Sequence, residues 1–320
     1  MSDPFFFARA PGLTLGDIVA VTGVRAGGGV DLSLLIGGAA PFDEAVAGEL
    51  TYFDDLEHIP IGLNPSESAP GSSEGIEATR ASACFVEPCY EALVAGFTLA
   101  LVTEEPHRAF AAALAQIFPE ALRPASIFTA AGLNPGASVH PEARLEPGVV
   151  VDPGAVIGAR CEIGSGSMIA ANSVIGSGVR IGRNCSIGAQ AAITHALIGD
   201  RVIIHEGAKI GQAGLDFRDC GEIRRFSSPQ VGRVILQDGV EVGANSTIDR
   251  GSSQDTVIGE GARIGNLVQI SPGVTVGRGC MILCQTSIAA ETRLGDFVVV
   301  EGGARVGRRL RIGRGERVRP

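Results

Sequence analysis

Three histidines in the C-terminal two thirds of the chain have side chains suited to acid–base or metal chemistry: His140, His195 and His205. A metal site requires several such ligands to converge on one ion, and the spacing of these three does not place them together. A histidine can also act as a general base near neutral pH. For a single histidine on the face of a repeat, a structural role is the commoner expectation.

The chain contains seven cysteines, an odd number without the close pairing typical of metal ligands. Cys161, Cys185 and Cys280 occur at one position of a repeated pattern, where other repeats have Ala or Ser. We therefore expect them to be packed free thiols. Such thiols predict a reducing, cytoplasmic location.

The pattern that positions these side chains is an aliphatic residue at every sixth position, without a slip over 139–193 and again over 258–312. Three residues after it, Gly or Asn is frequent, as at Gly148 and Asn172. These residue types adopt a left-handed backbone conformation with little strain. A short strand, an inward aliphatic side chain and a left-handed corner, repeated many times, predict a solenoid. We predict a mainly β protein built on a left-handed parallel β-helix of hexapeptide repeats, a triangular prism.

The repeat is interrupted at residues 212–230, which do not follow the pattern, and more briefly near 252–256. A solenoid accommodates an insertion as a loop, and such loops often carry functional residues. The longer insertion contains these charged and aromatic residues: Asp216, Phe217, Arg218, Arg224, Arg225 and Phe226.

Residues 1–125 lack the repeat and predict a small α/β domain. Residues 126–138 are expected to form a linker, and the β-helix to occupy 139–320. In chain order, the expected elements of the small domain are a short helix opened by Thr14, short strands within 31–52, buried strands at 81–86 and 99–102, and a helix at 107–118 that begins with Pro106.

Composition excludes several classes of protein. The net charge of −9 argues against a general nucleic-acid-binding protein. The chain has no uncharged apolar stretch of about 18 residues, so no transmembrane helix is predicted. Residues 1–10 lack the pattern of a signal peptide. The last coil is nevertheless basic, which predicts either a solvated face or an anchor for phosphate or an acidic partner: Arg305, Arg308, Arg309, Arg311, Arg314, Arg317 and Arg319.

Residues 243–251 have the sequence Gly-Ala-Asn-Ser-Thr-Ile-Asp-Arg-Gly, and Asp-Thr-Val-Ile-Gly follows at 255–259. With segments 202–205 and 230–235, and Gly-Glu-Leu-Thr-Tyr-Phe at 48–53, this block resembles the UDP-3-O-acylglucosamine N-acyltransferases of lipid A biosynthesis. The resemblance covers nearly the whole chain. It implies a homotrimer that moves a 3-hydroxyacyl chain from acyl carrier protein to the 2-amine of a UDP-linked acylglucosamine. The acyl donor is then a carrier-protein thioester, and no cofactor is implied.

Carried over residue by residue, the resemblance implies a uridine site in the N-terminal α/β domain and an acyl-transfer site on the prism. The family's aromatic pair on the uracil ring falls on Tyr52 and His58. Asn266 and Gln269 match two residues of the segment that bears the family's catalytic histidine, so we expect both to bind substrate. The histidine position itself is Pro272.

The substitution at Pro272 bears directly on catalysis. Attack of an amine on a thioester needs a base that takes the amine proton, and proline has no such group. The family's nearby aspartate falls on Gly265, and a later histidine falls on Arg309. No catalytic residue can therefore be carried over. We expect turnover to be absent or slow unless another group, such as His205, supplies the base.

Two functions remain open from the sequence. One is the N-acyltransferase, favoured by whole-chain resemblance; the other is a catalytically inactive trimeric paralogue that binds nucleotide sugar or acyl carrier protein, favoured by the missing base. A third class, a metal-dependent hexapeptide enzyme such as a γ-type carbonic anhydrase, would need His140, His195 and His205 to converge. The sequence predicts no metal site.

Overall fold

The computed structural model describes residues 7–27, 30–53, 79–128, 131–214 and 229–320. The chain divides into two compact units, Met1–Leu122 and Arg123–Pro320. The sequence-predicted linker belongs to the second unit, where the Ser126 hydroxyl donates a hydrogen bond of 2.5 Å to Asp152 Oδ1. His58 and the six insertion residues named above lie outside the described residues.

The N-terminal unit is a five-stranded sheet in the order β1-β5-β4-β3-β2, parallel except for β1 at the edge. The strands are β1 Arg25–Ala26, β2 Gly38–Ala39, β3 Glu49–Tyr52, β4 Ala83–Val86 and β5 Leu99–Val102. The helices are α1 Leu15–Thr22, η2 Pro88–Tyr90, α3 Glu91–Val94, α4 Pro106–Ile117 and η3 Pro119–Leu122.

Local sequence explains the first of these helices. The Thr14 side chain accepts a hydrogen bond from the Asp17 backbone N–H, and the Asp17 carboxylate accepts one from the Thr14 N–H, which forms a capping box. Gly23 ends the helix with φ of 67°. The helix buries Leu15 and Ile18 in the core on one side of the sheet.

The central strand β4 separates two clusters of buried side chains. Phe85 packs with the residues of α1 and α4 on one face, whereas Cys84 and Val86 face a second cluster that contains Phe42 and Phe53. This alternation is the two-residue period of a strand that is buried on both faces. The predicted small α/β domain is therefore present.

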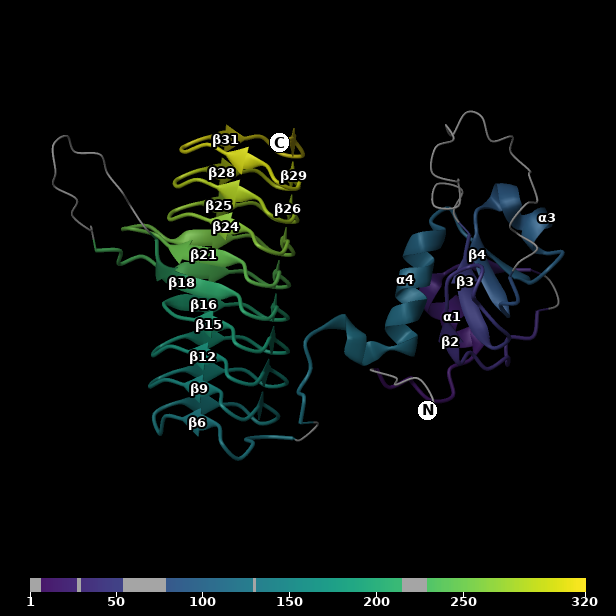
Figure 1. Cartoon of the computed structure of the whole chain (residues 1–320), viewed down its shortest axis with the longest axis horizontal. Coiled ribbons are helices and arrows are strands. Elements are labelled where there is room, and N and C mark those ends of the chain that lie inside the picture. The colour runs from purple at the N-terminus through teal and green to yellow at the C-terminus, as the bar shows by residue number, and fades with distance from the viewer. Residues whose placement is uncertain (1–6, 28–29, 54–78, 129–130, 215–228) are drawn as a thin grey trace. The chain divides into compact units, whose positions relative to one another are not determined.

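The second unit is a solenoid of three parallel sheets with nine strands each, whose coils stack along one axis in Figure 1. Sheet I comprises β6 Ser138–Val139, β9 Val156–Ile157, β12 Val174–Ile175, β15 Ala192–Ile193, β18 Lys209–Ala213, β21 Thr247–Arg250, β24 Gln269–Ile270, β27 Ser287–Ile288 and β30 Arg305–Val306. Sheet II comprises β7 Arg144–Leu145, β10 Glu162–Ile163, β13 Arg180–Ile181, β16 Ala196–Ile198, β19 Val234–Leu236, β22 Thr256–Ile258, β25 Thr275–Val276, β28 Arg293–Leu294 and β31 Arg311–Ile312. Sheet III comprises β8 Val150–Val151, β11 Met168–Ile169, β14 Ser186–Ile187, β17 Ile203–Ile204, β20 Glu241–Val242, β23 Arg263–Ile264, β26 Met281–Ile282, β29 Val299–Val300 and β32 Arg317–Val318.

The repeated aliphatic residues form the core of the prism. Ile163 on β10, for example, stacks in register between Leu145 and Ile181 of the neighbouring coils and is 2% exposed. The small-residue positions are also buried, including the thiols of Cys161, Cys185 and Cys280. The predicted fold class is confirmed as a mainly β, hexapeptide-repeat parallel solenoid. No helix within the described residues is long and apolar enough to span a membrane.

The corners of the prism have the predicted backbone conformation. Gly148 and Asn172, three residues after an inward aliphatic side chain, have φ of 81° and 59°. The structure also places side chains such as Leu267 and Phe297 in this conformation, with φ of 57° and 60°. These residue types cost about 1–2 kcal/mol there, so the regular stacking of the coils imposes the corner even where the local sequence does not favour it.

Candidate functional site

The longer insertion leaves the solenoid between two strands of sheet I that are longer than the others. Strands β18 and β21 pair beyond the usual repeat, with Gln212 opposite Asp249 and Ala213 opposite Arg250, and they lie side by side in Figure 1. Gln212 and Ala213, which the sequence analysis assigned to the insertion, thus extend strand β18. We refer to the paired ends of β18 and β21, together with Gly214 and Gln230, as the insertion stem.

A glycine is required where β18 departs from the repeat. The register shifts between Ile210 and Gln212, and Gly211 within this bulge has φ of 80°. A Cβ on Gly211 would lie 1.6 Å from the backbone oxygen of Thr194. Glycine therefore allows the bulge that carries Gln212 over Asp249.

Arg250 fastens both sides of the insertion stem. Its Nε donates to the Gln230 backbone oxygen at 2.8 Å, and its Nη1 donates to the Gly211 backbone oxygen at 3.1 Å. The Gln230 amide side chain accepts from the Gly214 N–H at 2.7 Å and donates to the Gly214 oxygen at 2.9 Å. These hydrogen bonds give the arginine of the Ile-Asp-Arg-Gly block a clear positioning role.

Asp249 is the buried carboxylate of the insertion stem, with 4% of its surface exposed. Its Oδ1 accepts a hydrogen bond of 3.0 Å from Gln212 Nε2. Burial raises the pKa of this carboxyl, because the charged form loses water, while the Gln212 hydrogen bond opposes the shift. The Asp249 backbone oxygen accepts from the Thr256 hydroxyl at 2.7 Å, and that hydroxyl accepts from the Gly273 N–H at 2.9 Å. The second, shorter interruption of the repeat is thereby hydrogen-bonded to Asp249 through Thr256.

Pro272 lies beside this carboxylate. A Cβ built on Gly214 would lie 2.6 Å from Pro272 Cγ and 2.8 Å from Asp249 Oδ2. Both atoms therefore lie against Gly214, at a point that has no room for a side chain. The position to which the resemblance assigns the catalytic histidine is thus at the insertion stem, next to a carboxylate that the sequence analysis did not single out. The signal for Asp249 was its place directly before the shorter interruption and within the Ile-Asp-Arg-Gly block.

The two substrate-binding residues predicted on the prism share a coil with Pro272. Gln269 lies in β24 opposite Thr247 of β21, with its side chain exposed. The Asn266 side chain accepts a hydrogen bond of 2.8 Å from the Ala244 N–H through Oδ1, which supports the neighbouring corner. Gly265 has no room for the family's aspartate, since a Cβ there would lie 2.7 Å from the Cys284 backbone nitrogen.

The predicted uracil-stacking residue lies in the N-terminal unit. Tyr52 ends strand β3 and is half-buried, and it packs against the core formed by that unit's sheet and helices. Its ring centroid lies 4.8 Å from that of Phe110 and 5.5 Å from that of His107. Helix α4, which carries both of these residues, therefore supplies the aromatic side chains beside Tyr52. His58, its predicted companion, lies outside the described residues.

The three histidines of the prism have separate surroundings. His205 Nε2 lies 2.9 Å from Glu241 Oε1, and Arg263 forms an ion pair with the same carboxylate. His140 Nδ1 accepts a hydrogen bond of 3.1 Å from the Glu142 N–H. His195 lies between β15 and β16, with φ of 46°. Within the described ranges no group of three His, Cys, Asp or Glu side chains could hold a metal ion.

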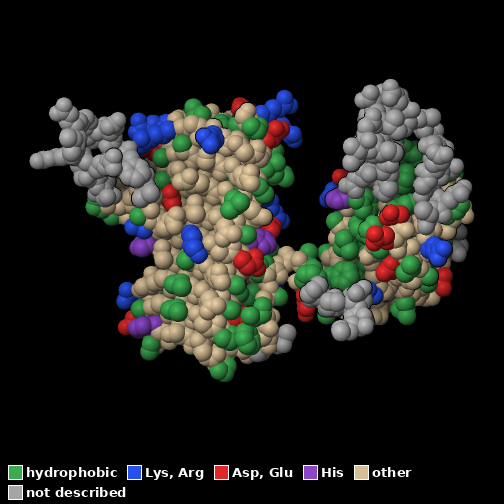
Figure 2. Space-filling model, in the orientation of Figure 1, with side chains coloured by type: hydrophobic (Ala, Val, Ile, Leu, Met, Phe, Trp, Pro, Cys, Tyr) green, Lys and Arg blue, Asp and Glu red, His purple; other side chains and the backbone are tan. Residues whose placement is uncertain are grey.

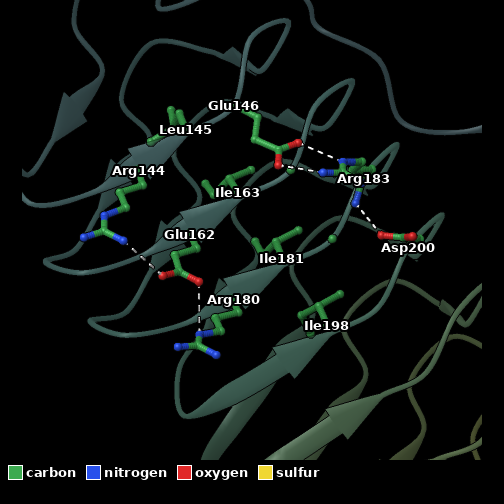
Figure 3. Close-up of a pocket in the computed structure, with 12 residues that line it drawn as sticks. Arg144, Leu145, Glu146, Glu162, Ile163, Arg180, Ile181, Arg183, Ile198 and Asp200 are labelled. Atoms are coloured by element: carbon green, nitrogen blue, oxygen red, sulfur yellow. Dashed lines mark hydrogen bonds and ion pairs between the residues drawn. The ribbon is translucent and has the colours of Figure 1, made fainter.

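A hollow of about 500 Å³ lies over sheet II near the start of the prism. Figure 3 shows its charged side chains paired with one another, with Glu162 between Arg144 and Arg180. At its rim Glu146 binds Arg183 at 2.9 Å. Hydrogen bonds from Arg183 and then from the Ser165 backbone lower the pKa of Glu146 to about 2. Because these charges already balance, the hollow makes a poor site for a charged ligand.

The basic end of the prism is partly paired as well. Figure 2 shows Lys and Arg side chains gathered at this end of the solenoid. Arg308 and Arg309 both bind Glu291, at 3.0 and 2.6 Å. Arg314 lies over the ring of Phe297, 5.3 Å from its centroid. Arg309 replaces the later family histidine, so that position now forms an ion pair.

Comparison with known proteins agrees with the repeat, and the similarity to known proteins covers nearly the whole chain. A family model described as bacterial transferase hexapeptide (six repeats) matches residues 136–171, 160–195 and 255–290. The UDP-3-O-acylglucosamine N-acyltransferase of Methylorubrum extorquens (strain PA1) is 54% identical over 318 residues, which cover 99% of this chain and 86% of that protein. The protein of the same name from Methylobacterium sp. (strain 4-46) is 52% identical over 318 residues, with the same coverage.

Among solved structures, the UDP-N-acetylglucosamine O-acyltransferase of Moraxella catarrhalis is 19% identical, with a TM-score of 0.42, and the alignment covers 58% of this chain and 66% of that one. The assignment rests instead on the two sequence relatives, which match almost every residue of the chain at more than half identity. This chain belongs to the family of UDP-3-O-acylglucosamine N-acyltransferases.

Proposed function

We propose that the protein transfers a 3-hydroxyacyl chain from an acyl carrier protein thioester to the 2-amine of UDP-3-O-acylglucosamine. The observation that carries this proposal is the identity of 52–54% across 99% of the chain to proteins named for this activity. The reaction needs no metal or organic cofactor, because the thioester is itself an activated acyl group. We expect the acyl-transfer site at the insertion stem, with Gln269 and Asn266 of the adjoining coil contacting the substrate.

The nucleotide part of the substrate is expected at the N-terminal unit. Tyr52 would stack on the uracil ring, and His58 would flank it. Helix α4 supports the tyrosine through Phe110 and His107, so the ring is held in place before the ligand arrives. A fixed aromatic ring is suited to stacking on a flat base.

We propose a homotrimer with parallel prisms as the working assembly. The outward side chains of sheet I include Val156 and Val174, and sheet III presents Met281, each more than two fifths exposed. Packing of neighbouring copies would cover these apolar positions. The arginines at the end of the prism fit an acidic partner such as acyl carrier protein. The six described cysteines form no disulfide, which fits a cytoplasmic location.

The proposal is tested by incubating the purified protein with acyl carrier protein thioester and UDP-3-O-acylglucosamine. The molecular mass of the sugar product is then measured by mass spectrometry. The product should gain one acyl chain on the amine. The matched control substrate has its 2-amine acetylated and should gain nothing. Binding of the UDP-sugar without product would instead identify an inactive paralogue.

A further inference from the structure

Acyl transfer to an amine requires a group that accepts the amine proton, and Pro272 cannot provide one. On the basis of the proposed function, we propose that Asp249 is the general base of the reaction, with Gln212 as the residue that positions its carboxylate. The assignment follows from the geometry of the insertion stem. Asp249 and Pro272 both lie against Gly214, and the Asp249 carboxylate reaches this point from the neighbouring coil.

The two oxygens of the Asp249 carboxylate have different surroundings. Oδ1 is held by Gln212 Nε2 at 3.0 Å, which fixes the orientation of the group. For Oδ2 no hydrogen-bond donor is present within the part of the chain that the structure describes. Gly214 lies against this oxygen, since a Cβ on that residue would lie 2.8 Å from Oδ2. Glycine at 214 therefore keeps a side chain away from this oxygen.

The charged groups around Asp249 are engaged elsewhere. Arg250, the next residue of β21, donates to the backbone oxygens of Gln230 and Gly211. Lys209 on β18 donates its Nζ to the Gln190 backbone oxygen. On the segment after β21, Asp255 is bound by Arg233 at 2.7 Å. Strand β24, on the other side, consists of Gln269 and Ile270 and has no ionisable side chain.

This environment suits a carboxylate that must bind a proton and release it. Burial raises the pKa of Asp249, and Gln212 supplies the opposing hydrogen bond. A carboxyl with a raised pKa is a better base than an exposed one, because its affinity for a proton approaches that of the group it serves. His205, the other candidate base, follows β17 at the corner between sheets III and I, whereas Pro272 follows β24 at the corner between sheets I and II.

The proposed step balances without any further reactant. The nitrogen lone pair of the neutral 2-amine attacks the thioester carbonyl carbon and forms the C–N bond. Asp249 Oδ2 takes the proton that the nitrogen then carries in excess. The tetrahedral oxyanion collapses, the C–S bond breaks, and the departing thiolate of the carrier receives the proton from Asp249. The products are the amide and the free thiol, and the carboxylate is regenerated.

The first test is the steady-state rate of Asp249→Asn. The asparagine retains an oxygen that accepts from Gln212 but cannot take a proton, so kcat should fall by about 10²–10⁴-fold while the KM for UDP-3-O-acylglucosamine and the thermal midpoint stay unchanged. Asp255→Asn is the matched control, because it removes a carboxylate of the same coil that binds Arg233. That control should retain the wild-type kcat. An Asp249→Asn variant with the wild-type kcat would overturn the proposal.

A second measurement separates catalysis from a structural role. In the wild type, the acid limb of the pH–kcat profile should report the ionisation of Asp249. Gln212→Leu removes the hydrogen bond that favours the charged carboxylate, so it should move this limb to higher pH. A merely structural Gln212 would lower stability and leave the limb in place, and that result would contradict the assignment.

A third variant asks whether a base at the proline position can replace Asp249. Adding Pro272→His to Asp249→Asn should recover at least about tenfold of the lost rate, since both side chains lie against Gly214. No recovery, together with an unmoved acid limb in Gln212→Leu, would overturn the proposal. If the wild type itself forms no product, the proposed function fails. If the wild type is active and Asp249→Asn is equally active, only the assignment of Asp249 fails.

Discussion

Position 272 is occupied by proline, and the residues around it show what that change leaves behind. Pro272 and Gly273 form the same corner as the Pro-Gly pairs earlier in the repeat, with φ of 71° at Gly273. The Asp249 carboxylate lies against Gly214, as does the Pro272 ring. The position to which the resemblance assigns the catalytic histidine therefore has a titratable group beside it. The expectation of absent or slow turnover, drawn from Pro272 and Gly265, did not include this group.

A prediction for a single residue concerns Tyr52 and the binding of UDP. Tyr52→Ala should weaken the binding of UDP several-fold, because stacking contributes about 0.5–1.5 kcal/mol beyond burial. Isothermal titration calorimetry with UDP measures the change. Tyr52→Phe is the control, since it retains the ring that packs on Phe110, and it should bind with nearly wild-type affinity. Equal affinities for the alanine variant and the wild type would remove Tyr52 from the nucleotide site.

Glu146 gives a pH-dependent prediction. Its pKa is lowered to about 2 from 4.5, so its pair with Arg183 stabilises the fold fully above about pH 4.5 and loses this effect as the pH falls towards about 2. Glu146→Gln should therefore lower the thermal midpoint slightly at pH 7, and the difference from wild type should shrink on acidification. Glu142→Gln, which removes a longer contact of 3.6 Å to Arg160, is the control. A difference that grows towards pH 2 would contradict the role assigned to the pair.

At the scale of elements, the bulge in β18 determines where the insertion stem lies. It brings Gln212 over Asp249, a residue 37 positions later in the chain. Hydrogen bonds from Arg250 then hold the stem on both sides. The position of the site therefore depends on two strands in adjacent coils, β18 and β21, and not on one segment alone.

Replacement of the bulge glycine should be costly. Gly211→Ala places a side chain in a left-handed conformation and within 1.6 Å of the Thr194 oxygen, so the free energy of unfolding should fall by about 2–5 kcal/mol. Gly303→Ala is the matched control, because Gly303 has φ of 76° but no atom within 4 Å of its added Cβ. That variant should lose only about 1–2 kcal/mol. Denaturant titration measures both, and equal losses would show that the contact with Thr194 is not limiting.

The periodic elements could be predicted from the sequence, whereas the contacts of the site could not. The aliphatic residues and the Gly or Asn corners depend only on local conformation, so the coils follow from spacing. Leu267 and Phe297 adopt the corner conformation because neighbouring coils impose it, and no local signal marks them. The pairing of Gln212 with Asp249 depends on the bulge at Gly211, which the sequence analysis placed at the edge of an insertion. Asn266 and Gln269 were found through the resemblance, and their substrate contacts remain predictions.

A further prediction concerns the assembly of three copies of the chain into a trimer. Apolar side chains on the faces of the prism, such as Val174 and Met281, should be covered by neighbouring copies. Sedimentation velocity at micromolar concentration should give a species of about three times the mass of the 32.8 kDa chain. A stable monomer at that concentration would contradict the trimer. Val174→Glu, at an exposed position of β12, should shift the protein towards monomer if this face is in the interface.

We predict N-acyltransferase activity for this chain in spite of Pro272. Its most direct test is the initial rate at which the wild-type protein converts UDP-3-O-acylglucosamine with saturating acyl carrier protein thioester. We predict a rate at least about 10²-fold above that of Asp249→Asn, the contribution expected of a positioned base. A wild-type protein that binds the UDP-sugar but forms product no faster than the reaction without enzyme would contradict the claim.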